Sequence, residues 1–345
     1  MITMLTAHTL EMDEPGVAVA DILGQLNLAE GLRKNAVGIM TCHADFLDSG
    51  VVKAVCDSLP FDVIGITTLG AATNQAADLE ILTISVLTSD DVAFSAVLTN
   101  SLETEQEAPI KAACAAAKAA LPPASPGSSP EPSLVLAYAP LLNHVGGERL
   151  VRLVDAALGG TPLFGTLACD HNFDFRDSQV IYNGEAYRDR LALAMLAGPV
   201  KWRFLTISVP EEKAEKQNAI ITESEGNVVK KVNELPVLDY LETLGLTREA
   251  GLEGSKSIPV ILDYNDGTPP VARCFYMISP EGHAVCGGEM PTGATFALSS
   301  MEPEDVILSA EQILDRVLAG EQSTGMLVIS CIVRSVNVVR LSSQR

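Results

Sequence analysis

Two stretches of this chain decide its fold: Asp62-Val-Ile-Gly-Ile-Thr-Thr-Leu-Gly70 and Thr161-Pro-Leu-Phe-Gly-Thr-Leu-Ala-Cys-Asp170. Each is an apolar run with a central glycine that ends in polar residues. Such a glycine is expected to let the backbone approach a ligand closely. An earlier apolar run, at Asn35–Thr41 and at Ser133–Ala139, precedes each of them, with a helical stretch in between. The repeated order predicts two related strand–helix–strand units.

Further apolar runs follow each unit, and they shape the fold prediction. Leu79–Leu87 and Val92–Thr99 flank the polar stretch Thr88–Asp91, which favours a hairpin. Because hairpins accompany the strand–helix alternation, we expect an α/β fold. Its mixed sheets are built from two related N-terminal α/β repeats plus a C-terminal α/β region.

The 345 residues are too many for one ordinary core and predict several domains. We expect a lead-in at 1–34 with a helix at Val17–Asn27, the two repeats at 35–215, and the C-terminal region at 216–345. Pro122–Pro132, with five prolines, predicts an exposed linker between the repeats. Further expected elements are strands at Trp202–Val209 and Met326–Val333, and helices at Pro236–Leu244, capped by Gly245, and at Glu302–Leu318.

Composition narrows the class of protein. Hydrophobic residues make up 47% of the chain and charged residues 19%, which is typical of a globular protein. A net charge of −21 disfavours nucleic acid and anionic membranes as partners. No apolar stretch is long enough to cross a bilayer, and the first residues do not resemble a signal peptide. The seven scattered cysteines are expected to be reduced and mostly buried, which places the chain in the cytoplasm.

The sequence lacks the common catalytic motifs. It has no phosphate-binding P-loop, no dinucleotide-binding glycine motif, no nucleophile elbow and no paired zinc motif. We therefore expect no catalytic residue, metal or cofactor. We expect His43 and His171 to meet solvent or to cap helices. The minor alternative is a metal site formed by His43, Asp45, Cys169, Asp170 and His171. For Cys331, a buried structural thiol is favoured over a reactive thiol.

The polar residues that follow strands are the candidates for ligand binding. Hydroxyl and carboxylate groups beyond strand ends suit a ligand crevice, although turn formation and helix capping explain them equally well. Glu289 and Arg334 offer the opposite charges that a zwitterionic amino acid needs. We expect one polar pocket between the repeats and the C-terminal region, with these ligand-binding residues: Thr67, Thr68, Thr166, Asp170, Glu289, Thr292 and Arg334.

In the order and spacing of its motifs, the chain resembles the FIST sensory proteins. The N-terminal part of the resemblance rests on Gly38–Thr41 with His43 and Asp45, Gly65-Ile-Thr-Thr-Leu-Gly70, Gly160-Thr-Pro-Leu-Phe-Gly165, and Tyr182-Asn-Gly184 leading into Leu191–Gly198. The C-terminal part rests on Gly226-Asn-Val-Val229, Pro236–Gly245, Gly287-Gly-Glu-Met-Pro-Thr-Gly293 and Ser330-Cys-Ile-Val-Arg334. The resemblance implies a domain that binds small ligands, amino acids among them, in signal transduction.

Two departures from the family pattern matter. Ala71 follows Gly70 where members often carry Glu, and the chain ends at Arg345 where members usually continue with a Gly- and aromatic-rich segment. We therefore expect the C-terminal region, 216–345, to be short or truncated relative to the family.

The leading hypothesis is a cytoplasmic small-molecule sensor that acts through an unidentified signalling protein. A Cys-dependent hydrolase or transferase that uses Cys331 or Cys169 is the alternative. A third possibility is a structural assembly subunit, because mixed sheets have edges that can pair.

Overall fold

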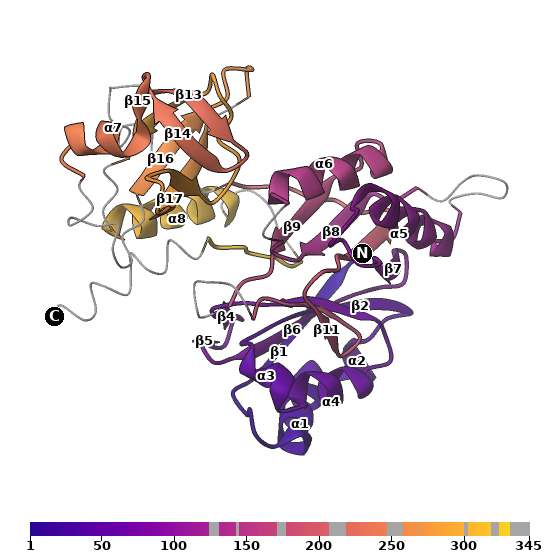
Figure 1. Ribbon diagram of the computed structural model, residues 1–345. Helices are drawn as coiled ribbons and strands as arrows, with labels where there is room; N and C mark the ends of the chain where they lie inside the picture. The colour runs from indigo at the N-terminus through magenta and orange to yellow at the C-terminus, as the bar shows by residue number, and fades with distance from the viewer. Residues whose placement is uncertain are drawn as a thin grey trace. The chain divides into compact units, whose positions relative to one another are not determined.

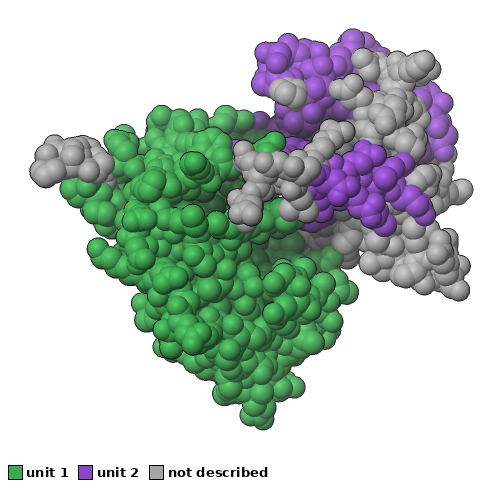
Figure 2. Space-filling model, turned by 180° about the vertical axis from the view of Figure 1, so that it is seen from behind, with its two compact units in different colours: residues 1–203, 324–329 green, residues 204–323, 330–345 purple. Residues whose placement is uncertain are grey.

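The computed structural model describes residues 1–123, 131–142, 145–170, 177–206, 219–246, 258–268, 270–299, 303–318 and 324–331. The chain divides into two compact units (Figure 2). Unit 1 comprises 1–203 with 324–329, and unit 2 comprises 204–323 with 330–345. The expected lead-in at 1–34 is therefore part of unit 1.

Unit 1 is built from two copies of one topology. The first repeat contains β1 (Thr3–Thr9), α1 (Pro15–Leu26), α2 (Leu28–Gly31), β2 (Asn35–Cys42), α3 (Asp45–Asp48), α4 (Val51–Asp57), β3 (Val63–Thr67), β4 (Ala71–Ala72), β5 (Ala77–Asp78) and β6 (Leu82–Ser89). The second contains β7 (Ala93–Leu98), α5 (Glu107–Ala120), β8 (Leu134–Ala139), α6 (Gly147–Leu158), β9 (Leu163–Leu167), β10 (Val180–Tyr182), β11 (Glu185–Tyr187) and β12 (Ala192–Ala197).

The strand orders confirm that the repeats are related. The first sheet runs β1-β6-β2-β3-β10-β11, and the second runs β7-β12-β8-β9. The four strands of the second sheet correspond one to one with β1-β6-β2-β3 of the first sheet. In each sheet the second and third strands of the repeat pair in parallel, and the other pairs are antiparallel. This confirms the expected mixed α/β class.

The two sheets pack face to face and helices cover their outer faces (Figure 1). Val37, Ile64, Leu136 and Ala194 belong to one buried cluster that contains residues of both sheets. The buried faces of α1 and α4 pack on the first sheet, and those of α5 and α6 pack on the second. Unit 1 is therefore a four-layer helix–sheet–sheet–helix sandwich.

The repeat boundary differs from the sequence prediction. The expected hairpin of Leu79–Leu87 with Val92–Thr99 is wrong, because β6 and β7 lie in different sheets. β6 already has β1 on one side and β2 on the other, so no edge is left for β7. β7 is the first strand of the second repeat, as β1 is of the first.

The proline-rich connector also has a different place. It joins α5 to β8 inside the second repeat, rather than joining the two repeats. Residues 124–130 lie outside the described residues. The exposed backbone expected there stays a prediction.

Unit 2 is dominated by antiparallel strands. Its elements are β13 (Ala219–Glu225), β14 (Val228–Val232), β15 (Leu235–Pro236), α7 (Val237–Thr243), β16 (Ile258–Asp263), β17 (Val271–Ile278), β18 (Ala284–Cys286), β19 (Thr295–Leu298) and α8 (Pro303–Leu318). The order β13-β19-β16-β17-β18-β14-β15 has an additional β13–β14 pairing, so six strands close on themselves. Phe275 and Phe296 meet edge to face in the interior, with ring centroids 5.6 Å apart.

Two helices of unit 2 match the sequence prediction. Gly245 has φ of +76° just past α7, and the N–H of Leu246 donates to the carbonyl of Leu241. This is the expected glycine cap. The helix expected at Glu302–Leu318 corresponds to α8.

The two late strand predictions differ from the structure. Residues 201–206 and 324–331 belong to no strand, and the rest of Trp202–Val209 and Met326–Val333 lies outside the described residues. Apolar alternation makes a segment fit to be a strand, but pairing requires a partner that local sequence does not specify.

Candidate functional site

The carboxyl ends of four strands are joined by backbone hydrogen bonds in unit 1. The N–H of Thr68 donates to the carbonyl of Cys42 (2.9 Å), which links the ends of β3 and β2. The N–H of Cys169 donates to the carbonyl of Thr67 (3.1 Å), and that of Ala168 donates to Ala139 (2.8 Å). We call this line of contacts the strand-end seam. It joins β2, β3, β9 and β8 across the two sheets, so that loops from both repeats leave from one place.

Thr67 is fully buried and ties β10 to the seam. Its hydroxyl accepts the N–H of Gln179 (2.8 Å), and its own N–H donates to the Gln179 carbonyl (2.9 Å). These contacts extend the β3–β10 pairing by one residue. The Thr67 side chain therefore has a clear structural role, and nothing in the local sequence marks Gln179 as its partner.

Asp170 is also fully buried, one residue beyond Cys169. Its Oδ2 accepts the N–H of Asp177 (2.6 Å) and lies 3.4 Å from the hydroxyl of Ser178. The carboxylate thus holds the start of the segment that leads into β10. A polar residue shortly after an apolar run was the signal that identified Asp170, whereas nothing local marks Ser178 as its partner.

The other two candidate threonines of unit 1, Thr68 and Thr166, make local contacts. The hydroxyl of Thr68 donates to the Gly70 carbonyl (2.6 Å) and accepts the Gly70 N–H (3.1 Å). The half-buried Thr166 lies on β9, and its hydroxyl is 3.3 Å from the Leu167 carbonyl. The structure therefore brings Thr67, Thr68 and Asp170 together at the seam, while Thr166 lies within β9, two residues before the seam residue Ala168.

The remaining predicted residues belong to the C-terminal part of the chain. Thr292 is exposed, and its hydroxyl lies 3.1 Å from that of Ser224. Glu289 is half-buried, and both residues are in unit 2. Arg334 lies outside the described residues. A single pocket that unites these residues with the seam stays a prediction.

Glycines Gly65 and Gly165 have a structural explanation. In the sequence they suggested a close approach of backbone to a ligand. A Cβ at Gly65 would collide with the carbonyl of Met40 on β2, and one at Gly165 would collide with the carbonyl of Ala137 on β8. Both glycines therefore let adjacent parallel strands approach.

Histidine and cysteine positions give little support to a metal or a reactive thiol. No group of three metal-binding side chains occurs within the described residues, from which His171 is absent. His43 is buried, and its Nδ1 accepts the N–H of Asp45 at the start of α3 (3.4 Å), so of its two expected roles it contacts a helix start rather than solvent. Cys42, Cys56, Cys114, Cys274 and Cys286 are buried, as predicted, and Cys169 is half-buried. Cys331 is exposed, so its expected burial is wrong: its strand is not formed in the described part.

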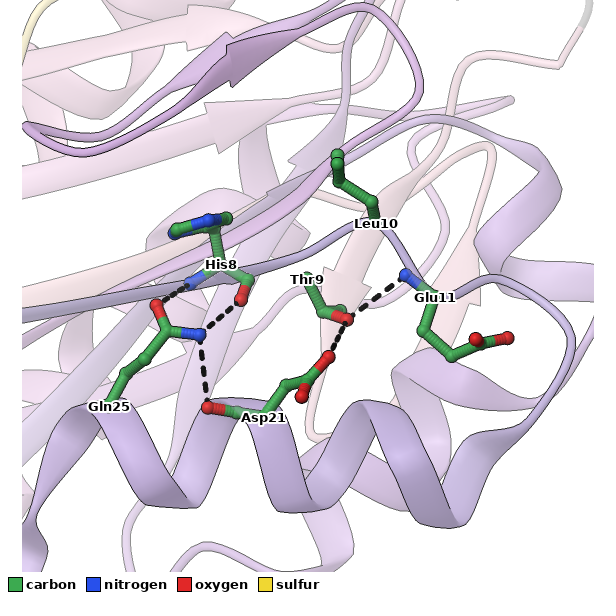
Figure 3. A pocket seen from close by; sticks show the side chains of 6 residues that line it. All are labelled: His8, Thr9, Leu10, Glu11, Asp21 and Gln25. Carbon is green, nitrogen blue, oxygen red and sulfur yellow. Dashed lines mark hydrogen bonds between the residues drawn. The ribbon is translucent and has the colours of Figure 1, made fainter.

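A hollow of about 430 Å³ lies beside β1 and α1 (Figure 3), and its lining includes none of the candidate residues that the structure describes. Gln25 dominates it: its side-chain amide accepts the N–H of His8 (3.1 Å) and donates to the His8 carbonyl (2.7 Å). Thr9 donates to Asp21 Oδ2 (3.0 Å). These contacts cover the outer edge of β1 with a side chain, so we assign the hollow a structural role.

A second hollow, of about 450 Å³, lies at the end of α4. It is lined by Cys56, Asp57, Leu59, Pro60, Phe61, Asp62 and Asn183. Burial raises the pKa of the Cys56 thiol to about 12, and the charge of Asp57 adds to the shift. This thiol is therefore protonated at neutral pH and is a poor nucleophile.

The described helices include none long and apolar enough to span a bilayer. No curated protein matches the chain. The solved structures that resemble it include that of cyanuric acid hydrolase from A. caulinodans, with 14% sequence identity, a TM-score of 0.30, and coverage of 58% of this chain and 72% of that chain. At that score the likeness carries no functional argument.

The family comparison is decisive. The model of the FIST N domain matches residues 36–234, which is more than half of the chain and includes both ends of the strand-end seam. FIST domains are sensory, small-molecule-binding domains of signalling proteins. The chain therefore belongs to the FIST family.

Proposed function

We propose that this protein is a cytoplasmic sensor of an amino acid or a close analogue, and that it binds the ligand at the strand-end seam and signals through a partner protein. The proposal rests on the backbone hydrogen bond between Cys169 and Thr67. This bond brings the loop after β3 in the first repeat next to the loop after β9 in the second. Ligands of open α/β sheets favour such carboxyl ends of strands.

The seam offers suitable chemistry. Asp170 supplies a buried carboxylate that suits an ammonium group, and the half-buried Cys169 is its neighbour. Because Asp170 also holds Asp177 and Ser178, a ligand that engages this carboxylate would alter the segment leading into β10. That coupling provides a route from binding to a change on the surface. Arg334, Glu289 and Thr292 stay candidates from the sequence for the carboxylate and remaining polar groups.

A thermal-shift screen of the full chain against amino acids, other carboxylates and amines tests the proposal. A sensor should be stabilised by one ligand class in a concentration-dependent way. In Asp170→Asn and in Arg334→Ala, loss of a charged contact of about 1.5–3 kcal/mol should weaken binding roughly tenfold to a hundredfold.

Matched controls separate binding from stability. Asp155→Asn on α6 and Lys111→Ala on α5 remove comparable charges at exposed positions, and should leave ligand affinity unchanged. Each variant is also melted without ligand, so that a loss of structure is seen independently. Unchanged affinity in Asp170→Asn would remove the seam from consideration. Turnover of the ligand would favour the hydrolase or transferase alternative.

A further inference from the structure

The two repeats differ at one sheet edge. β3 pairs with β2 on one side and with β10 on the other, and all five of its residues are buried. β9 occupies the same position in the second repeat, yet within the described residues it pairs only with β8. None of its five residues is buried, and Gly165 is exposed. The hairpin that corresponds to β10–β11 is β4–β5, which forms a separate two-stranded sheet and does not reach β9.

Within the described part of the chain, the edge of β9 lacks the protection found on two other edges of unit 1. The outer edge of β1 is covered by the Gln25 amide, which occupies both backbone groups of His8 (Figure 3). The outermost strand β11 carries Glu185, paired with Lys53 (3.2 Å). By contrast, Thr161–Leu167 contains no charged residue. Exposed edges without charge or cover are templates for pairing with another strand.

The backbone of β9 presents its hydrogen-bonding groups at alternate residues. The Pro162 carbonyl accepts the Val135 N–H, and the Ala168 N–H donates to Ala139, so even-numbered residues face β8. The N–H and C=O groups of Leu163, Gly165 and Leu167 consequently face the open edge. These three positions are symmetric about Gly165, with a leucine two residues away on each side.

We infer that β9 is a homodimerisation edge: it pairs antiparallel with β9 of a second copy of this chain, centred on Gly165. In this register Gly165 faces its own counterpart, and Leu163 faces Leu167 of the second copy. Both leucines pack on the helical layer of α5 and α6, so each cross-strand pair is apolar. The two second sheets then become one continuous sheet around a two-fold axis, which closes the assembly.

The choice of a second copy rests on two features. The equivalent edge of β3 is already an interface between repeats, so the proposed contact continues an existing type of pairing. The edge is also self-complementary in register and has no charge that would repel its own copy.

Sedimentation velocity of the full chain over a concentration series tests the inference. We expect a reversible monomer–dimer equilibrium. Leu163→Lys and Leu167→Glu each place a charge opposite an apolar residue, and should raise the dissociation constant at least about tenfold. Val97→Lys, at a half-buried aliphatic residue on the opposite edge strand of the same sheet, is the matched control and should leave the dimer intact.

The double variant Leu163→Lys/Leu167→Glu tests the register. Each lysine then faces a glutamate of the second copy, so dimerisation should recover at least in part relative to either single variant. A parallel or shifted register would not bring these charges together. Failure to recover would overturn the proposed pairing.

Hydrogen exchange on the unmodified chain gives a readout that does not depend on variant folding. The amides of Leu163, Gly165 and Leu167 should become more protected as concentration rises, while the outer edge of β7 should not change. A chain that sediments as a monomer up to about 1 mM would overturn the inference. So would a dimer in which these three amides stay unprotected.

Discussion

The two repeats of unit 1 share one topology and end differently. In the first, the third strand is an interior strand of a six-stranded sheet, and in the second it is an edge of a four-stranded sheet. The difference arises in the segment after that strand. Only 14 residues separate β3 from β6, whereas 24 separate β9 from β12 and include the β10–β11 hairpin that joins the first sheet. Thus a repeated core can acquire distinct edges through one connection.

The largest expected effect tests the shared feature of the two third strands. Gly65→Ala should destabilise the protein by about 3 kcal/mol, because the new Cβ meets the Met40 carbonyl and β3 is held between two strands. Gly165→Ala should cost less in the dilute monomer, about 1–2 kcal/mol, because within the described residues no strand pairs with the outer side of β9. Urea unfolding measures both.

The control is Gly24→Ala on α1, where a Cβ would meet nothing within 4 Å. It should stabilise the protein by about 0.5–1 kcal/mol, since alanine is the better helix residue. Equal losses for Gly65→Ala and Gly165→Ala would contradict the difference in strand environment.

A smaller effect should come from the turn that fixes β10 against β3. Asn183 has φ of +49°, and its side-chain oxygen accepts the N–H of Val63 (2.8 Å). Asn183→Ala leaves this N–H without its partner and replaces asparagine, which tolerates the left-handed region, with alanine, which is strained there, so we expect a loss of about 2 kcal/mol. Asn183→Gly should cost about half as much, because it removes the hydrogen bond without the strain. Thermal unfolding compares the two variants, and equal losses would exclude the strain contribution.

At neutral pH the smallest effect comes from the thiols of the outer helices, because their ionisation changes stability only above pH 9. Burial raises the pKa of Cys56 in the first repeat to about 12 and that of Cys114 in the second to about 11, from an ordinary value of 9.0. Above pH 9 the unfolded chain loses protons that the folded chain keeps. The free energy of unfolding should therefore fall by about 1.4 kcal/mol per pH unit for each such thiol.

Cys56→Ala and Cys114→Ala should each remove the contribution of one thiol to this slope between pH 9 and 11. Between pH 11 and 12 only Cys56→Ala should change the slope, because the Cys114 thiol then ionises in the folded chain as well. Stability measured against pH for both variants separates the repeats. An unchanged slope in Cys56→Ala would show that its thiol ionises alike in the folded and unfolded chain.

Local patterns predicted many elements but few of their partners. The apolar runs at β2, β3, β8 and β9 identified the repeats, and Gly245 identified the end of α7. The hairpin prediction for β6 and β7 failed because both runs are apolar on alternate residues, and alternation does not specify a partner. The role of Gly65 was misassigned for a similar reason. A glycine in a strand indicates a close approach, but only the neighbouring strand reveals that the Met40 carbonyl fills the space.

For the candidate site, residue type and position after a strand were enough to select Thr67 and Asp170. Their contacts with Gln179 and with Asp177 and Ser178 required the three-dimensional arrangement, because a segment of the second repeat crosses to β3. The sequence by itself thus determined the repeated strand–helix–strand pattern, the acidic character and the family resemblance, since these depend on periodicity and composition. Only the tertiary structure decided which strand fills which edge, because pairing depends on the distant segments that reach each edge first.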